Sequence, residues 1–334
     1  MDVERLPAYV EDQGFIGKRC QSSANQQPPS YSLLVLVYSS QDEITRKAFS
    51  YAGRCGKIKA MKVSFTQPEK QLSPYVAFIW VFESSFGVPL ADSRIIVPDG
   101  RAKIIVPYRN ALCAAVNTRL LNAKEHQIFL VGIQSNPTTI TSTATDTGTI
   151  GVELTPKGLY HFFNLSMHEI TNRMVSFEEL FGPQGARLQN RVGDAEDPQE
   201  KVMLLQTALT HLLQKNEKEY LLLDHTLDLI AQTHGLIRVQ ELEAQTGYTR
   251  RYLDMLFKEH VGVSPKSLAS IMRFQELYQV WTQQKSPTFF RNNLYTYYYD
   301  QSHFIKEFKR FTGFTPQKYH EIVNEFGRAF YAKQ

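Results

Sequence analysis

The sequence predicts an α+β protein of two domains, in which an antiparallel β-barrel or sandwich-like module with flanking helices precedes an all-α domain. Three observations predict this division. Short apolar and β-branched runs, separated by Gly, Pro, Ser and Asn, fill roughly the first 150 residues. From residue 220 onward, apolar residues recur at helical spacing instead. The polar stretch QKNEKE lies between the two patterns, so we expect domains at 1–213 and 220–334, joined by a linker at 214–219.

Five segments of the N-terminal half have the composition of strands. They are YSLLVLVY (31–38), KIKAMKVSF (57–65), YVAFIWVF (75–82), RIIVPDGRAKIIVPY (94–108) and QIFLVGI (127–133). In the fourth segment, Asp99-Gly100 favours a tight turn. We expect Arg101 and Lys103, which follow it, to lie at a solvent-exposed hairpin tip rather than in an anion-binding pocket.

Helical patterns replace the strands from residue 154. The segment LTPKGLYHFFNLSMHEITNRMVSFEELFG (154–182) predicts two helices with a break at Asn164-Leu165-Ser166. The next stretch, 183–201, is polar and punctuated by Gly and Pro. A further helix is predicted after Asp197, which is a suitable cap, because Pro198 follows it at the first helical position.

Bulk composition narrows the class of protein without identifying its partner. The 334 residues are 43% hydrophobic and 12% aromatic, which favours packed cores over disorder. The net charge is only +4, but residues 236–334 carry 14 basic and 9 acidic side chains. This C-terminal excess is compatible with a polyanionic partner.

Cysteine usage and hydropathy predict where the protein acts. Cys20, Cys55 and Cys113 are widely spaced and form no CxxC pair, which favours reduced thiols over a disulfide framework or a zinc site. The N-terminus has no secretory pattern, and no apolar run approaches the roughly 20 residues needed to span a bilayer. We therefore expect a cytoplasmic protein with no membrane partner, no metal and no cofactor.

Two helix–turn–helix units are predicted in the C-terminal domain. The first, at about 238–260, has two short helices around the turn TGY, with Thr249 as the cap of the second helix. Leu253, Leu256 and Phe257 predict its buried face. Its outward face would carry Arg250, Arg251, Asp254, Met255 and Lys258.

A connecting helix at 264–284 and a second unit at about 288–312 follow. The connecting helix would be roughly 30 Å long, close to one turn of B-DNA. In the second unit, Asp300 would cap a helix anchored by Phe304, Ile305, Phe308 and Phe311. The rest of its surface would carry Gln301, Ser302, His303, Lys306, Lys309 and Arg310.

These segments resemble the AraC/XylS family of transcription regulators. DQSHFIKEFKRFTGFTPQKYH is similar to the family's C-terminal signature, and LEAQTGYTRRYLDMLFKEHVGVSPKSL is similar to its first helix–turn–helix. The resemblance implies a domain with two recognition helices in successive major-groove segments. Carried over by position, the base-facing residues would be Arg251, Asp254 and Met255 in the first unit, and Gln301, Ser302, His303 and Lys306 in the second.

One region departs from the family pattern. PTFFRNNLYTYYYD places Asn292 and Asn293 where an apolar–small pair is usual, and Tyr297 near the position of a usual glycine. We therefore expect the helix before the second recognition helix to be shortened, shifted or packed differently. For Tyr297, Tyr298 and Tyr299, packing beneath the second unit is favoured over phosphate contact.

The N-terminal half resembles, over short pieces, the β-rich module that precedes this domain in some family members. The pieces are IVPDGRAKIIV, GVELTPKGLYHFF and MHEITNRMVSFEELFG. The resemblance implies that this module senses a small-molecule effector or holds a homodimer together. Double-stranded DNA is the expected partner, and an effector, RNA polymerase and a second copy of the chain are candidates.

Two other functions stay open at this stage. One is a β-barrel enzyme or stoichiometric repair protein with an appended DNA-binding domain, although the dispersed cysteines and the lack of a defensible catalytic set disfavour it. The other is a DNA-independent assembly protein, which the atypical region at 288–299 favours. The leading expectation is a non-enzymatic, one-component transcription regulator that binds specific DNA.

Overall fold

Strand β11 (Thr147–Leu154) is the centre of the larger of two sheets. It pairs antiparallel with β4 (Val76–Ser84) on one side and β6 (Ala102–Arg109) on the other. All eight of its residues are buried, because both faces of the strand are covered. This computed structural model describes residues 35–39, 50–52, 58–84, 95–110, 113–116, 119–141, 146–215, 220–284 and 296–321.

The remaining strands extend this sheet and build a second one. The larger sheet has the order β1-β3-β4-β11-β6-β9-β12, with β2 paired to β3, and the smaller has the order β5-β10-β7-β8. The added strands are β1 (Val35–Ser39), β2 (Ser50–Ala52), β3 (Ile58–Thr66), β5 (Ile95–Ile96), β7 (Cys113–Val116), β8 (Arg119–Asn122), β9 (Phe129–Val131), β10 (Thr138–Thr141) and β12 (Met174–Ser176). The predicted α+β class is confirmed, with the difference that β1 pairs parallel to β3.

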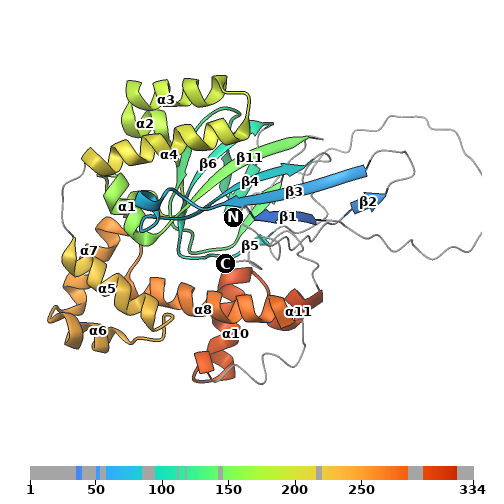
Figure 1. Cartoon of the computed structure of the whole chain (residues 1–334). Coiled ribbons are helices and arrows are strands. Elements are labelled where there is room, and N and C mark those ends of the chain that lie inside the picture. The colour runs from blue at the N-terminus through green and yellow to red at the C-terminus, as the bar shows by residue number, and fades with distance from the viewer. Residues whose placement is uncertain are drawn as a thin grey trace, which may run out of the picture. The chain divides into compact units, whose positions relative to one another are not determined.

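Helices of the N-terminal half pack along the larger sheet (Figure 1). They are the 3₁₀ turns η1 (Lys70–Leu72) and η2 (Met167–Glu169) and the helices α1 (Pro156–Phe162), α2 (Phe177–Phe181), α3 (Pro183–Asp194) and α4 (Pro198–Lys215). The Lys201 ammonium is buried and donates to the carbonyls of Val192 and Ala195 at the end of α3. It thereby satisfies carbonyls that the helix itself leaves unpaired, which fixes α3 against α4.

The second helix expected within 154–182 is not formed as predicted. Residues 167–169 make a 3₁₀ turn, Asn172 has a φ of +57°, and β12 then pairs with β9. Pairing of β12 with β9 at the sheet edge outweighs the helical sequence pattern of the residues before α2. Of the second predicted helix, only the part that forms α2 is α-helical, and it begins with a capping box between Ser176 and Glu179. The polar stretch after it, for which no element was predicted, forms α3.

The turn at Asp99-Gly100 is also placed differently from the expectation. Lys103 is not at an exposed tip, because its side chain is only 15% exposed and pairs with Asp99 and Glu153. The turn itself packs on the C-terminal domain. The Pro98 carbonyl accepts a hydrogen bond from Gln275 at 2.5 Å, and a Cβ at Gly100 would lie 3.1 Å from Leu268.

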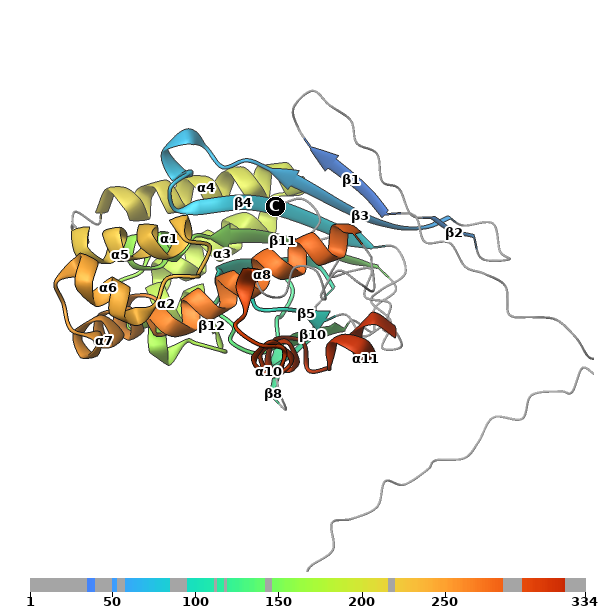
Figure 2. The same cartoon turned by 90° about the horizontal axis from the view of Figure 1, so that it is seen from below.

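The C-terminal half is helical. Its helices are α5 (Leu221–Gln232), α6 (Val239–Thr246), α7 (Arg250–His260), α8 (Pro265–Gln284), α10 (Gln301–Thr312) and α11 (Pro316–Glu321). Figures 1 and 2 agree that α5, α6 and α7 lie at one end of α8, and α10 and α11 toward the other. No helix of the described ranges has both the length and the apolar composition to cross a bilayer.

Polar contacts join the two halves within Ser32–Gln334, which clusters as one compact unit. Lys157 pairs with Asp228 at 2.8 Å, and the Tyr160 hydroxyl donates to Asp224. The limits expected for the two domains stay predictions, since most of the expected linker, 216–219, lies outside the described residues.

Candidate nucleic-acid interface

The turn between α6 and α7 is fixed at both ends. Gly247 ends α6 with a φ of +75°, a left-handed conformation that side-chain-bearing residues rarely adopt. Thr249 caps α7 by accepting from the Tyr252 amide, and Glu243 of α6 accepts from the Arg250 amide at 2.6 Å. These bonds satisfy amides that the first turn of α7 leaves unpaired.

Helix α7 has one buried face and one face open to solvent. Leu253 and Phe257 are completely buried, and the predicted third member of that face, Leu256, is half-buried. The opposite face carries the four residues expected to contact DNA in the first unit. Arg250, Arg251 and Met255 are exposed, while Asp254 is half-buried and lies 3.6 Å from the Arg250 guanidinium.

Two tyrosines that the sequence reasoning did not single out complete this face. Tyr248 and Tyr252 are 45% and 39% exposed, and their rings stack at 5.1 Å with an interplanar angle of 22°. The signal was present in GYTRRY, where two aromatic residues four positions apart flank the cap of α7. Exposed aromatic rings of this kind can contact sugars, thymine methyl groups or phosphates.

Helix α10 repeats the arrangement. Asp300 caps it by accepting from the His303 amide at 2.7 Å, and Gly313 ends it with a φ of +82°. Phe304, Phe308 and Phe311 are buried. The exposed residues of α10 include all six that were expected to read or contact DNA: Gln301, Ser302, His303, Lys306, Lys309 and Arg310.

A buried ion pair and an aromatic ring hold α10 on α8. Arg273 of α8 lies 2.8 Å from Glu307 of α10, with the two side chains only 16% and 11% exposed. The Arg273 guanidinium also lies 5.0 Å from the centre of the Tyr298 ring. Tyr298 is buried and therefore packs beneath the second unit, whereas Tyr299 is 92% exposed. The first helix expected in this unit, from about 288, lies largely outside the described residues.

Helix α8 sets the spacing of the two units. It has 20 residues, which corresponds to about 30 Å at the usual rise of 1.5 Å per residue. Four residues separate the end of α7 from its start. The phenylalanines of α10 contact Phe274 at the middle of α8 and Trp281 near its end. The two capped helices are thus held on one rigid element (Figure 2).

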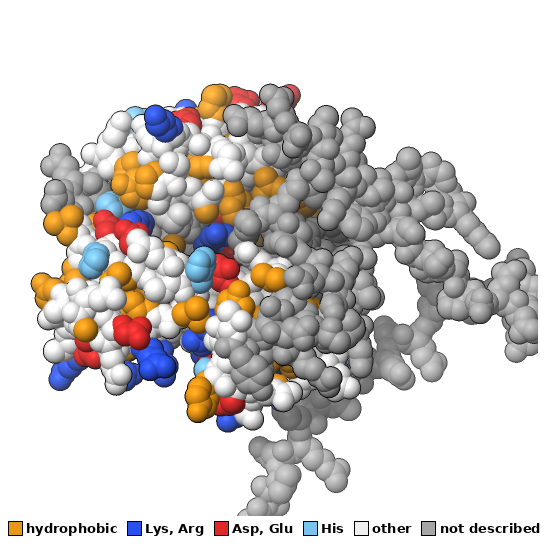
Figure 3. All heavy atoms as spheres, turned by 60° about the horizontal axis from the view of Figure 1, so that its bottom comes forward, with side chains coloured by type: hydrophobic (Ala, Val, Ile, Leu, Met, Phe, Trp, Pro, Cys, Tyr) orange, Lys and Arg blue, Asp and Glu red, His pale blue; other side chains and the backbone are white. Residues whose placement is uncertain are grey.

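The electrostatics of this side of the molecule are mixed. Figure 3, which brings the bottom of Figure 1 forward, shows Lys and Arg side chains interspersed with acidic ones rather than a continuous basic field. Within the described ranges, no group of three His, Cys, Asp or Glu side chains is arranged to hold a metal ion. The chemistry that this surface offers is therefore hydrogen bonding and cationic contact from two exposed helix faces.

Comparison with known proteins agrees with this arrangement. The family model for a helix–turn–helix domain matches residues 242–322, and that for a domain of unknown function (DUF6597) matches residues 64–176. No curated protein matches the sequence.

Solved structures with a similar course of the chain include two of ToxT from Vibrio cholerae. A ToxT variant from strain SCE256 has 10% identity and a TM-score of 0.42, over 77% of this chain and all of that chain. A second ToxT structure has 11% identity and a TM-score of 0.39, over 80% and 99%. An EutQ protein from Salmonella typhimurium has 8% identity and a TM-score of 0.23, over 32% and 80%.

These likenesses are too low to carry an argument, so the assignment rests on the matched domains and on the two capped helices. The chain carries a helix–turn–helix domain of the AraC type at residues 242–322, after a β-rich N-terminal region.

Proposed function

We propose that a single chain binds two successive major-groove segments of specific DNA, one with α7 and one with α10. The observation that carries this proposal is the shared construction of the two helices. Each is capped at its N-terminus, buries an apolar face and exposes polar and basic side chains around its first turns. Both pack on α8, whose length of about 30 Å is close to the 34–36 Å repeat of the major groove.

In this proposal, Arg251, Asp254 and Met255 read bases at one block of the site, and Gln301, Ser302, His303 and Lys306 read the other. Arg250, Lys309 and Arg310 contact phosphates. An arginine pairs with guanine in a bidentate manner, and a methionine suits a thymine methyl group. Basic residues beside the reading surface give affinity that falls steeply with salt.

The Arg251 assignment can be tested by removing the side chain. Arg251→Ala should weaken binding by about 1–3 kcal/mol and relax base preference at one block only. The measurement is selection of bound fragments from random DNA, followed by titration of the selected site by gel shift at two salt concentrations.

A matched control is Arg187→Ala, which removes an exposed arginine from α3 in the N-terminal domain. It should leave both affinity and base preference unchanged. Equal affinity and selectivity of Arg251→Ala and wild type would show that α7 does not read DNA through this residue. Absence of any DNA selection by the wild-type protein would overturn the proposal and favour an assembly function.

The N-terminal domain would supply control and pairing. Helix α4 belongs to the helices at 159–213 that we expect to pair two copies, and its Met203 side chain is 56% exposed. A homodimer would place four reading helices on repeated sites. Measurement of the molecular mass in solution decides whether the chain is a dimer, and Met203→Lys tests whether α4 lies in the interface. A small-molecule effector, contact with RNA polymerase and a cytoplasmic location belong to the same proposal.

A further inference from the structure

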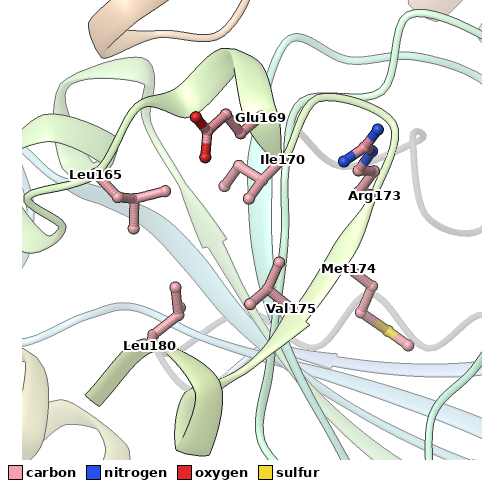
Figure 4. Close-up of a pocket in the computed structure, with 7 residues that line it drawn as sticks. All are labelled: Leu165, Glu169, Ile170, Arg173, Met174, Val175 and Leu180. Atoms are coloured by element: carbon pink, nitrogen blue, oxygen red, sulfur yellow. The ribbon is translucent and has the colours of Figure 1, made fainter. Parts of the chain in front are cut away.

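A hollow beside β12 is lined by one continuous stretch of chain. It has a volume of about 390 Å³, which lies within the range of roughly 300–1,000 Å³ found for small-molecule sites. Figure 4 shows that its wall comes from the turn around η2, from β12 and from α2. The lining residues are Leu165, Glu169, Ile170, Arg173, Met174, Val175 and Leu180.

The hollow combines an apolar wall with two opposite charges. Leu165, Ile170, Val175 and Leu180 give it an aliphatic surface, and Met174 adds a flexible thioether. In Figure 4 the Glu169 carboxylate and the Arg173 guanidinium both lie above the aliphatic side chains, the carboxylate to the left of Ile170 and the guanidinium to its right. In the part of the chain that the structure describes, neither charged side chain has an ion pair or a side-chain hydrogen bond.

We propose that this hollow is a binding site for a small zwitterion with an apolar group, the chemistry of an apolar α-amino acid. A carboxylate would accept two parallel hydrogen bonds from the Arg173 guanidinium. An ammonium group would pair with Glu169, and the apolar group would bury the aliphatic wall. A simple anion would meet repulsion from Glu169, and a simple cation would meet repulsion from Arg173, so both charges together define the ligand class.

The same stretch of chain also holds the first DNA-binding unit. The Ser166 hydroxyl donates to Glu259 near the end of α7 at 2.6 Å. The Thr171 hydroxyl donates to the Gly262 carbonyl at 2.8 Å. Gly262 has a φ of +91°, and a Cβ there would lie 2.6 Å from the Thr171 hydroxyl, so the backbones approach closely.

Residues that line the hollow are therefore interspersed with residues that hydrogen-bond to the end of α7 or to the turn after it. Leu165, Glu169 and Ile170 line the hollow, while Ser166 and Thr171 contact the chain at Glu259 and Gly262. A ligand that orders this turn would favour one orientation of α7. This step rests on the proposed DNA-binding function, whereas the ligand site itself does not.

Calorimetry on the full chain without DNA tests the site. The probes are L-phenylalanine and L-leucine, compared with 3-phenylpropionate and phenethylamine, which each carry one charge. We expect one of the zwitterions to bind about tenfold or more tightly than either singly charged compound. Arg173→Gln and Glu169→Gln should each weaken it by about tenfold or more, while Arg187→Gln and Glu178→Gln, on α3 and α2, should not.

Three results would overturn the site. They are no heat of binding with either amino acid at millimolar concentration, equal binding of a singly charged compound, and full binding by both pocket variants. If binding is weak, protection of the 165–180 peptide from hydrogen exchange by the same probes gives a second readout.

Gel shift with and without the bound amino acid tests the coupling. The Ser166→Ala/Thr171→Val double variant should bind the amino acid like wild type but lose its effect on DNA affinity. An unchanged DNA affinity of wild type on saturation would overturn the coupling and leave the site standing. A wild-type protein that binds no DNA would contradict the proposed function, and the calorimetry would still decide the site.

Discussion

The Lys103 ammonium is held between two carboxylates inside the N-terminal sheet. Its Nζ lies 2.6 Å from Asp99 Oδ2 and 2.5 Å from Glu153 Oε2, and Glu153 also accepts from the Trp80 indole at 2.9 Å. Burial alone would lower the pKa of Lys103, but the two carboxylates outweigh burial and raise it above the ordinary value. The lysine is therefore charged in the folded protein throughout the neutral range.

Removing this lysine should destabilise the N-terminal sheet. Lys103→Met leaves two carboxylates close together, one of them 4% exposed, so we expect a loss of about 3 kcal/mol in the free energy of unfolding. Adding Glu153→Gln keeps an acceptor for Trp80 but removes one charge, and should recover part of the loss. Urea unfolding of the single and double variants measures this, and an additive double variant would contradict the assigned pairing.

His161 should make stability depend on pH. Its ring lies 4.6 Å from Tyr75 and 5.3 Å from Tyr220, and burial, helped by Lys157, lowers its pKa against the opposing effect of Asp224. Because the folded pKa lies below the unfolded value, the unfolded chain takes up its proton first as the pH falls. The contribution of His161 is then complete above the ordinary pKa of about 6.5 and declines below it.

The matched variant is His161→Phe, which keeps an aromatic ring without a titrating nitrogen. Its melting temperature should fall less between pH 7.5 and pH 5.5 than that of wild type. Other titrating groups are common to both proteins, so the difference reports His161. An equal or larger fall in the variant would mean that His161 does not carry this dependence.

At the scale of the element, α10 depends on contacts that its own sequence only partly supplies. Its phenylalanines pack on Phe274 and Trp281, and Glu307 and Arg273 form a largely buried ion pair at the same junction. A buried pair of this kind adds little net stability compared with apolar residues, but breaking it leaves an uncompensated charge. It therefore fixes where α10 sits on α8.

Glu307→Gln should therefore loosen the second unit and spare the first. The uncharged side chain leaves Arg273 without its ion pair, and we expect a loss of about 3 kcal/mol or more in the docking of α10. Footprinting on the selected DNA should then show one protected block instead of two. Glu200→Gln, an exposed change on α4, should keep both blocks. Equal weakening of both blocks by Glu307→Gln would mean that the two helices do not act as separate units.

Some elements could be predicted from sequence because their signals are local. Thr249 and Asp300 cap the helices that follow them, and phenylalanines at i, i+4 and i+7 predict the buried face of α10. The central strand β11 was not predicted, because TGTIGVEL is rich in Gly and Thr and has both faces buried, so no alternation marks it. Residues 167–176 were assigned to a helix because edge pairing with β9 is a non-local event.

In the candidate site, too, local features could be predicted from the sequence and non-local contacts could not. The exposed positions of α7 and α10 follow from helical periodicity once the buried face is known, whereas Tyr248 was overlooked because it precedes the helix. The role of Tyr298 depends on Arg273, which precedes it on α8, and on Glu307, which follows it on α10. No pattern within a single helix predicts such a three-way contact.

At the scale of the whole molecule, polar contacts in the described residues tie the N-terminal domain to the first helix–turn–helix unit more directly than to α10. The turn around η2 contacts α7 and the residues after it through Ser166 and Thr171, and Lys157 and Tyr160 of α1 contact α5. On the α8 side, Gln275 donates to the Pro98 carbonyl and the Gly100 turn packs against Leu268, but no polar contact to α10 itself is found within the described residues. A change in the N-terminal domain should therefore reach α7 before it reaches α10.

Hydrogen exchange on the Ser166→Ala/Thr171→Val variant tests this asymmetry. Each lost hydrogen bond contributes about 1 kcal/mol, so local opening at the end of α7 should become about tenfold or more frequent. Peptides covering 250–262 should then exchange faster, while peptides covering 301–312 serve as an internal reference and stay unchanged. Faster exchange in both regions would mean that the C-terminal domain opens as a single unit, so that Ser166 and Thr171 do not stabilise α7 separately from α10.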